Sequence, residues 1–195
     1  MNRTTKLGNK IELIGQGKTL IIGVFHGDEP QGKFLIEKYT KTDGLMFIPC
    51  LNPDGMQLGR RTNANGVDLN RNFPTKNWEI SDKDDYFGGN SPASEIETQF
   101  VIDVIEKYKP ELIITLHAPY KVVNYDGPAK EIAEKISDII KYPVEASIGY
   151  PTPGSFGTYA GIERQIPTIT LELDETCPVE DLIKPVHQIF DLFSE

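Results

Sequence analysis

The fold is decided by the stretch Gly23-Val24-Phe25-His26-Gly27-Asp28-Glu29, which leads into a predicted helix over residues 30–39. An apolar strand that ends in a polar turn and is followed by a helix is the unit of parallel α/β sheets. His26 and Glu29 lie on that turn, at the carboxyl end of the strand, where open α/β sheets bind their ligands. The stretch therefore predicts both a fold class and the position of a functional site.

A second histidine occupies the same kind of place, because His117 ends the apolar run Leu112-Ile113-Ile114-Thr115-Leu116. Two histidines and one glutamate, with a fourth position left to water, form a catalytic zinc site. His26, Glu29 and His117 are therefore candidate zinc ligands. Taken alone, the two histidines also fit ordinary loop positions, since short motifs often match by chance.

The remaining hydrophobic pattern predicts a mixed α/β fold. Predicted strands cover residues 11–14, 19–25, 45–50, 111–116, 144–148 and 167–173, and predicted helices cover 30–39, 94–108, 129–141 and 179–193. A turn is expected at Gly15-Gln16-Gly17, and Ser94-Glu95-Ile96-Glu97 matches a helix-capping box. This alternation indicates a largely parallel sheet flanked by helices. With 195 residues and no visible linker, a single domain over 1–195 is expected.

Net charge and the length of the apolar stretches exclude some classes of binding partner. The net charge of −9 argues against sequence-independent nucleic-acid binding, which needs a basic face. The apolar stretches are too short to cross a bilayer and no signal peptide is visible, so no membrane partner and a cytoplasmic location are expected. The oligomeric state is left open. Only two cysteines are present, and Cys50 and Cys177 are expected to be reduced structural thiols.

Two further features carry chemical meaning. Glu172 lies in the apolar run 166–173, where it is either an edge carboxylate facing water or a proton acceptor beside a metal-bound water. The segment 60–76 has no strand or helix periodicity and is rich in Asn, Gly and Arg. Guanidinium groups there suit the binding of a carboxylate or of a developing oxyanion, although solvated surface arginines are the ordinary alternative.

Six motifs occur in order: HGDE at 26–29, NPDG at 52–55, RTNANGVDLNRNFP at 61–74, TLH at 115–117, GYPTPGSFG at 149–157 and TLELDE at 170–175. Together they resemble the zinc carboxypeptidases of the carboxypeptidase A type, and most closely the bacterial murein peptide amidases. The resemblance covers roughly residues 8–180. It implies a zinc-carboxypeptidase-like α/β fold and one zinc ion per chain.

The resemblance also implies roles for individual residues. The zinc ligands fall on His26, Glu29 and His117, and the general base on Glu172. The arginine that polarises the substrate carbonyl falls on Arg61, the pair that binds the substrate carboxylate on Asn70 and Arg71, and a mobile substrate-capping tyrosine on Tyr150. Arg60 receives no role.

The function implied is zinc-dependent hydrolysis of the γ-D-glutamyl–meso-diaminopimelate amide bond in a small murein peptide. A general carboxypeptidase that releases ordinary L-amino acids would share every catalytic residue. An N-acyl-amino-acid deacylase would share the HxxE and Asn-Arg elements, and a zinc-free binding module could keep the fold. The short interval from His117 to residue 150, with room for one helix and one strand, predicts a shallow cleft that suits a γ-linked D-residue.

Overall fold

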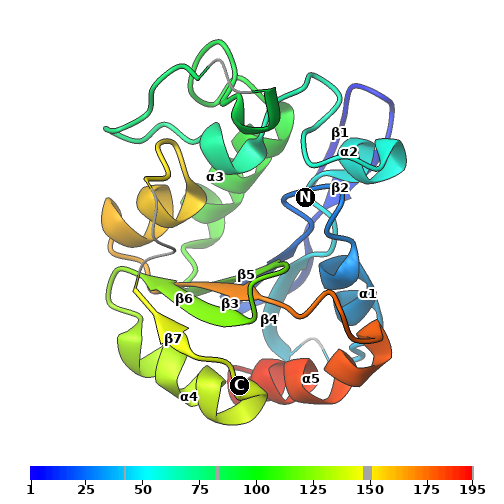
Figure 1. Cartoon of the computed structure of the whole chain (residues 1–195), viewed down its shortest axis with the longest axis vertical. Coiled ribbons are helices and arrows are strands. Elements are labelled where there is room, and N and C mark those ends of the chain that lie inside the picture. Colours follow the sequence, from blue (N-terminus) through cyan, green and yellow to red (C-terminus); the bar gives the residue numbers. More distant parts are fainter. Residues whose placement is uncertain (42, 82–83, 147–150, 195) are drawn as a thin grey trace.

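A central six-stranded sheet runs through the protein, which the computed structural model describes over residues 1–41, 43–81, 84–146 and 151–194 (Figure 1). The strand order is β4-β3-β5-β8-β6-β7, and β1 and β2 form a separate antiparallel pair. The strands are β1 (Asn2–Thr4), β2 (Lys10–Glu12), β3 (Ile14–Gly23), β4 (Asp43–Ile48), β5 (Leu112–His117), β6 (Val122–Asp126), β7 (Val144–Glu145) and β8 (Thr168–Glu172).

Strand direction in the sheet is mostly uniform. β4, β3, β5 and β8 are parallel neighbours, whereas β6 runs antiparallel to β8 and parallel to β7. This confirms the predicted mixed, largely parallel sheet. β6 was not predicted, so the described part of the interval after His117 contains two strands and a helix rather than one of each. Of the strand predicted over 144–148, β7 forms the first part, and residues 147–150 lie outside the described ranges.

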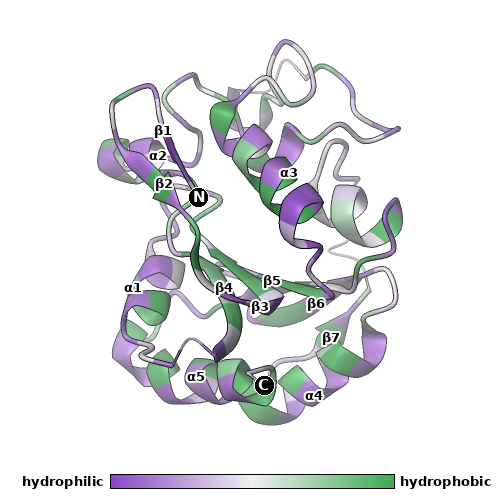
Figure 2. Ribbon diagram, turned by 180° about the vertical axis from the view of Figure 1, so that it is seen from behind, coloured by the Kyte–Doolittle hydropathy of each residue, from purple (hydrophilic) through white to green (hydrophobic). Residues whose placement is uncertain are grey.

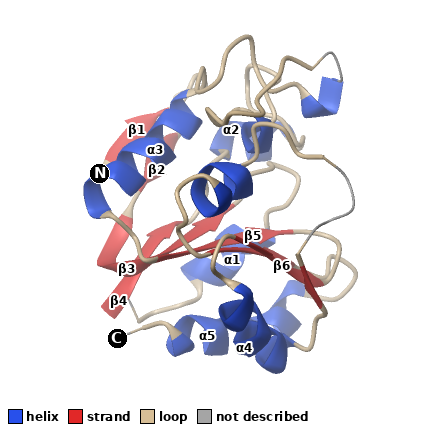
Figure 3. Cartoon of the chain, turned by 90° about the vertical axis from the view of Figure 1, so that its left-hand side faces the viewer, coloured by secondary structure: helices blue, strands red, loops and turns tan. Residues whose placement is uncertain are grey.

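Helices cover both faces of the sheet (Figures 1 and 3). On one face lie α1 (Gln31–Glu37), α4 (Lys130–Ile140) and α5 (Ile183–Leu192), and on the other lies α3 (Ile96–Tyr108). The remaining helical segments are short: α2 (Pro53–Leu58), 3₁₀ turns at Leu69–Arg71, Asp84–Tyr86 and Val179–Leu182, and a π-helical turn at Thr158–Ile162. No helix in the described ranges is long and apolar enough to cross a membrane.

Each face of the sheet has its own apolar core, and Figure 2 shows the hydrophobic strands between the helical layers. Ile21 of β3 packs in the same cluster as Leu35 of α1, whereas Leu20 and Ile22 pack in the cluster that contains Phe100 of α3. Neighbouring side chains of a strand point to opposite faces. A parallel sheet covered on both sides needs central strands that are largely apolar, as β5 and the second half of β3 are.

The same alternation places the polar strand ends. Leu116 of β5 and Leu171 of β8 belong to the core on the α1, α4 and α5 side. The residues that follow them, His117 and Glu172, therefore point to the α3 side. They are also direct neighbours in the parallel ladder. The two strand ends thus bring these side chains to one edge of one face.

Two local predictions were wrong. Gly15 and Gly17 do not form a turn but continue β3, which pairs irregularly with β4 at these positions. A Cβ at Gly17 would lie only 1.8 Å from the carbonyl oxygen of Gly44, so this close approach requires glycine. The capping box is also absent. The N-cap residue of α3 is Glu95 rather than Ser94, its side chain makes no capping hydrogen bond, and the carboxylates of Glu95 and Glu97 accept hydrogen bonds from Asn63. Cys50 and Cys177 are both free thiols, as expected.

Candidate active site

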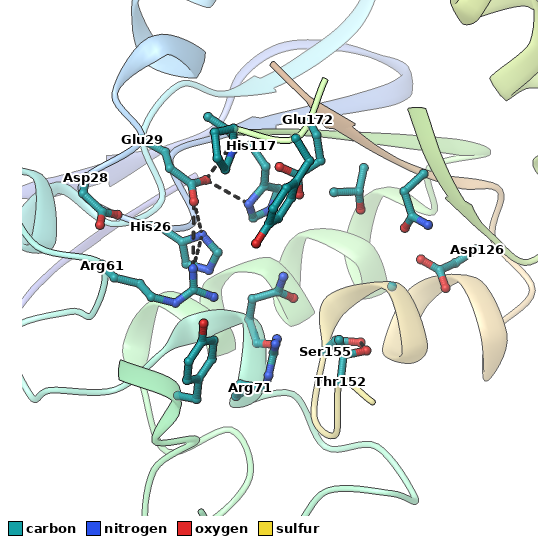
Figure 4. A pocket seen from close by; sticks show the side chains of 18 of the residues that line it. His26, Asp28, Glu29, Arg61, Arg71, His117, Asp126, Thr152, Ser155 and Glu172 are labelled. Atoms are coloured by element: carbon teal, nitrogen blue, oxygen red, sulfur yellow. Dashed lines mark hydrogen bonds and ion pairs between the residues drawn. The ribbon is translucent and has the colours of Figure 1, made fainter. Parts of the chain in front are cut away.

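A pocket of about 370 Å³ opens at the carboxyl ends of β5 and β8, on the α3 side of the sheet. Figure 4 shows Asp28 and Arg61 on one side of it, and Asp126, Thr152 and Ser155 on the other. Its lining is mainly polar and includes the predicted residues His26, Glu29, Arg61, Asn70, Arg71, His117 and Glu172. Tyr150 lies outside the described residues, so its predicted capping role stays a prediction.

The turn that carries His26 begins with an unusual backbone conformation. Val24, the residue after β3, has φ 57°, which is rarely adopted by a β-branched residue. Hydrogen bonds hold the chain there: the amide of Asn52 donates to the carbonyl of Val24 at 2.9 Å, and its side-chain amide donates to the carbonyl of Phe25 at 3.3 Å. The NPDG motif therefore fixes the HGDE turn through Asn52. The motif itself forms the start of α2 and is not a free loop.

Three candidate ligands meet at one point in the pocket. Nδ1 of His26 lies 2.7 Å from Oε1 of Glu29, and Nδ1 of His117 lies 3.0 Å from Oε2 of the same carboxylate. One donor atom from each residue lies within 4.8 Å of the others, and both imidazoles are buried. Two imidazole nitrogens and one carboxylate in so small a space match the ligand set of catalytic zinc. The residues present therefore fit a zinc ion.

A buried carboxylate, Asp68, lies behind this cluster. Its Oδ1 lies 3.3 Å from Nε2 of His26, as an ion pair rather than a well-aligned hydrogen bond. Burial by itself would lower the pKa of His26, but the carboxylates of Glu29 and Asp68 outweigh it and raise that pKa to about 9. A carboxylate on the far nitrogen of a metal-binding histidine orients the ring and makes it a stronger ligand.

Asp68 also holds Arg61. Nε and Nη2 of Arg61 donate to Oδ2 of Asp68 at 3.1 and 2.9 Å, while Nη1 lies 3.3 Å from Nδ1 of His26. Burial works against the charged guanidinium, but the neighbouring Asp68 carboxylate raises the pKa of Arg61 above its ordinary value. A fixed cation therefore faces the candidate metal position. The ring of Tyr86 lies 5.0 Å from Cζ of Arg61 and 5.7 Å from Cζ of Arg71, between the two guanidinium groups.

Asn70 and Arg71 come from the 3₁₀ turn that follows Asp68. The side-chain oxygen of Asn70 accepts a hydrogen bond from the amide of Phe156 at 2.8 Å, which ties this turn to the 151–157 segment. The Arg71 guanidinium donates to the carbonyl of Asn70 at 2.6 Å, and the residue is buried. Both side chains line the pocket, so an anion entering it would meet a preset cation.

Glu172 completes this side of the pocket. It pairs with His117 in the ladder between β5 and β8, and its buried Oε2 atom has no hydrogen-bond partner among the residues that the structure describes. Burial is the main cause that raises its pKa above the ordinary value, although nearby His117 works in the opposite direction. A desolvated carboxylate beside a metal site is well suited to accept a proton.

Several residues at the site were not predicted. Tyr86, Asn124 and Asp126 line the pocket, and Asp68 supports it through Arg61. Asp68 had one usable signal, because it lies within the GVDLNRNFP motif between two apolar residues. Tyr86 and Asp126 had none, because neither adjoins a motif that points to the site.

Comparison with known proteins places this geometry in a family. The family model described as zinc carboxypeptidase matches residues 25–138, a segment that holds the His-Glu-His cluster and both pocket arginines. The chain belongs to the zinc carboxypeptidase family. Murein peptide amidase A of Escherichia coli K12 is 36% identical over 157 residues, which cover 72% of this chain and 64% of that relative. The chain thus matches less than two thirds of that relative's length.

Two other zinc carboxypeptidase relatives agree with this assignment. Murein peptide amidase A of Vibrio campbellii is 34% identical over 175 residues, covering 79% of this chain and 68% of that protein. The crystal structure of a murein-tripeptide amidase from Escherichia coli O157 superposes with a TM-score of 0.87 and 28% identity, covering 98% of this chain and 90% of that chain. Glu172 lies beyond the segment matched by the family model, so its place in the site comes from the fold.

Proposed function

We propose that this protein is a zinc-dependent amidase that hydrolyses the γ-D-glutamyl–meso-diaminopimelate bond of murein peptides. One arrangement supports a hydrolase most strongly. The His-Glu-His cluster has a desolvated carboxylate, Glu172, on one side and two guanidinium groups, Arg61 and Arg71, on the other. A metal position, a proton acceptor and two fixed cations within one pocket are the groups that amide hydrolysis needs.

His26, Glu29 and His117 would hold one zinc ion per chain, and that ion would polarise the amide carbonyl and acidify water. Glu172 would take the proton from the attacking water and return it to the departing amine. Arg61, fixed by Asp68, would donate hydrogen bonds to the oxygen that becomes negative in the transition state. Arg71 and Asn70 would bind the free carboxylate of the leaving residue, and Tyr150 would close over it.

The named relatives support the choice of bond. Murein peptide amidases match over most of this chain, and the polar lining of the pocket suits a charged leaving residue better than an apolar one. Residues 1–195 would form one catalytic domain, and the expected cytoplasmic location stays a prediction that cell fractionation would check. A general carboxypeptidase would use the same residues, so substrate comparison decides between the two.

Product analysis tests the proposal. The zinc-loaded protein is incubated with L-alanyl-γ-D-glutamyl-meso-diaminopimelate, and the products are identified by mass spectrometry. Free diaminopimelate and the L-alanyl-D-glutamate dipeptide are expected, with a kcat/KM far above that for peptides ending in L-Phe, L-Leu or L-Lys. An equal or higher value for an ordinary L-peptide would favour the general carboxypeptidase. No hydrolysis of any peptide by zinc-loaded protein would contradict both.

A further inference from the structure

The side of the pocket away from Arg61 contains a carboxylate for which the mechanism above has no use. Asp126 ends β6, and in Figure 4 it lies beyond Glu172 and above Ser155. β6 and β8 pair so that Val122 lies opposite Glu172, Asn124 opposite Thr170 and Asp126 opposite Thr168. Since alternate residues share a face, Glu172, Thr170, Asn124 and Asp126 all point into the pocket.

The row of side chains from Glu172 to Asp126 indicates in which direction, and over what distance, a bound substrate could extend. Asp126 lies four positions along β6 from Val122, the residue opposite Glu172, and four positions of strand span about 13 Å. In the proposed mechanism the amine of the leaving residue departs beside Glu172, so the side chain of that residue would extend along this row. Uncharged polar groups line the way: Asn124, Thr152, Ser155 and Thr170. The described lining is mainly polar, so it suits a polar side chain better than an apolar one.

The side chain of Asp126 has no hydrogen-bond or ion-pair partner among the described residues, whereas the carboxylates of Glu29 and Asp68 do. Two glycines shape its surroundings: a Cβ at Gly157 would lie 2.1 Å from Oδ2 of Asp126, and one at Gly161 would lie 2.4 Å from its Cβ. The carboxylate therefore packs against bare backbone. Burial alone raises the pKa of Asp126 to about 6. A partly buried charge without a partner is unfavourable unless a ligand supplies that partner.

We propose that Asp126 is a specificity-determining residue that binds a primary ammonium group at the far end of the leaving residue's side chain. Arg71 and Asp126 then bind opposite charges within one pocket. A residue with a carboxylate at its Cα and an ammonium several bonds away satisfies both. Diaminopimelate has this pattern. The assignment rests on the proposed function and deepens it, because it names a group that recognises the side chain of the leaving residue.

Ligand binding tests this assignment without relying on turnover. The zinc-loaded protein is titrated by calorimetry with meso-diaminopimelate and with L-2-aminopimelate, which differ only in the distal amine. The wild type is expected to bind diaminopimelate about 10- to 100-fold more tightly, the range for a hydrogen bond to a charged group. Asp126→Asn, of nearly the same shape, should remove this preference by weakening only diaminopimelate binding. Glu175→Gln removes a charge from another pocket-lining residue and should preserve the preference.

A second variant covers the case in which Asp126→Asn folds poorly. Gly157→Ala keeps every charge but places a methyl group against Oδ2 of Asp126, so it should also reduce the preference. Equal binding of the two amino acids by the wild type, no binding of either, or a preference that survives both substitutions would overturn the role of Asp126. A clear preference in a protein that hydrolyses no murein peptide would instead refute the proposed function and leave the ammonium site standing.

Discussion

Asp68 and Arg61 are joined by two hydrogen bonds, because Nε and Nη2 of Arg61 both donate to the buried Oδ2 atom of Asp68. The other carboxylate oxygen of Asp68 lies 3.3 Å from Nε2 of His26 and accepts a hydrogen bond from the amide of Asn70 at 2.8 Å. One carboxylate therefore orients a candidate metal ligand, the candidate oxyanion-binding arginine and the start of the carboxylate-binding turn.

Replacing Asp68 by Asn should weaken both metal binding and turnover. We expect zinc affinity or kcat to fall by about 10- to 100-fold, the usual effect of removing a carboxylate that orients a metal-binding histidine. Zinc affinity is measured by competition with a chelator of known affinity. Asp54→Asn is the matched control, because Asp54 is equally buried but binds Thr5, Leu7 and Asn9. An equal loss of zinc affinity in both variants would show that the effect is only structural.

Much of this arrangement is predictable from sequence, because strand ends and short motifs are local features. His26, Glu29 and His117 each follow or end a recognisable apolar run, and parallel pairing brings such ends together. Asp126 is different. β6 offers only Val122 and Val123 as adjacent apolar residues, too short a run to identify a strand, and its antiparallel place beside β8 depends on long-range packing.

Side-chain competition explains another failed prediction. Ser94 and Glu97 have the spacing of a capping box, but the carboxylate of Glu95 accepts hydrogen bonds from Asn63 and Asn65, and that of Glu97 accepts one from Asn63. These asparagines lie some thirty residues away in the RTNANGVDLNRNFP motif. A local pattern cannot show that a distant loop takes the groups that would otherwise cap the helix.

Removing zinc should lower both activity and stability. A ligand that binds only the folded state raises the free energy of unfolding in proportion to the logarithm of its concentration over its dissociation constant. We therefore expect the Tm to fall after treatment with a chelator and to recover when zinc is added back. In His117→Ala, which lacks one candidate ligand, added zinc should no longer raise the Tm. A normal zinc response in that variant would exclude His117 as a ligand.

Glu172→Gln should separate chemistry from metal binding. The amide keeps the shape of the side chain but cannot accept a proton, so kcat should fall by about 10²- to 10⁴-fold, the range for general acid–base catalysis. Zinc content, measured by atomic absorption, should stay at the wild-type level. Near-normal turnover would mean that another group in the pocket transfers the proton.

The two arginines should differ in the kinetic constant that they control. Arg61→Ala should mainly lower kcat, by about 10²- to 10³-fold, because an oxyanion donor acts in the transition state. Arg71→Ala should also raise KM, because a substrate carboxylate is bound before and during the reaction. A substrate whose terminal carboxylate is amidated provides the check. If the wild type processes that substrate with an unchanged KM, Arg71 does not bind the carboxylate.

Glu97 should make stability depend on pH. Burial is the largest cause that raises its pKa to about 7, and the side chain is almost fully buried beside Glu95 and Asn63. Between the unfolded pKa and about 7 the folded protein therefore holds a proton that the unfolded chain releases, so stability falls as the pH rises across this interval and the loss is complete above about pH 7. Glu97→Gln should remove this loss and raise the free energy of unfolding at pH 8 by about 1 to 3 kcal/mol. The gain should vanish at pH 4, where the carboxyl is protonated in both states.

Urea unfolding at the two pH values measures this gain in the free energy of unfolding. Glu106→Gln, on the exposed side of α3, is the control and should change that free energy little. A gain of equal size at pH 4 and pH 8 would mean that improved packing, rather than the buried charge, accounts for the effect.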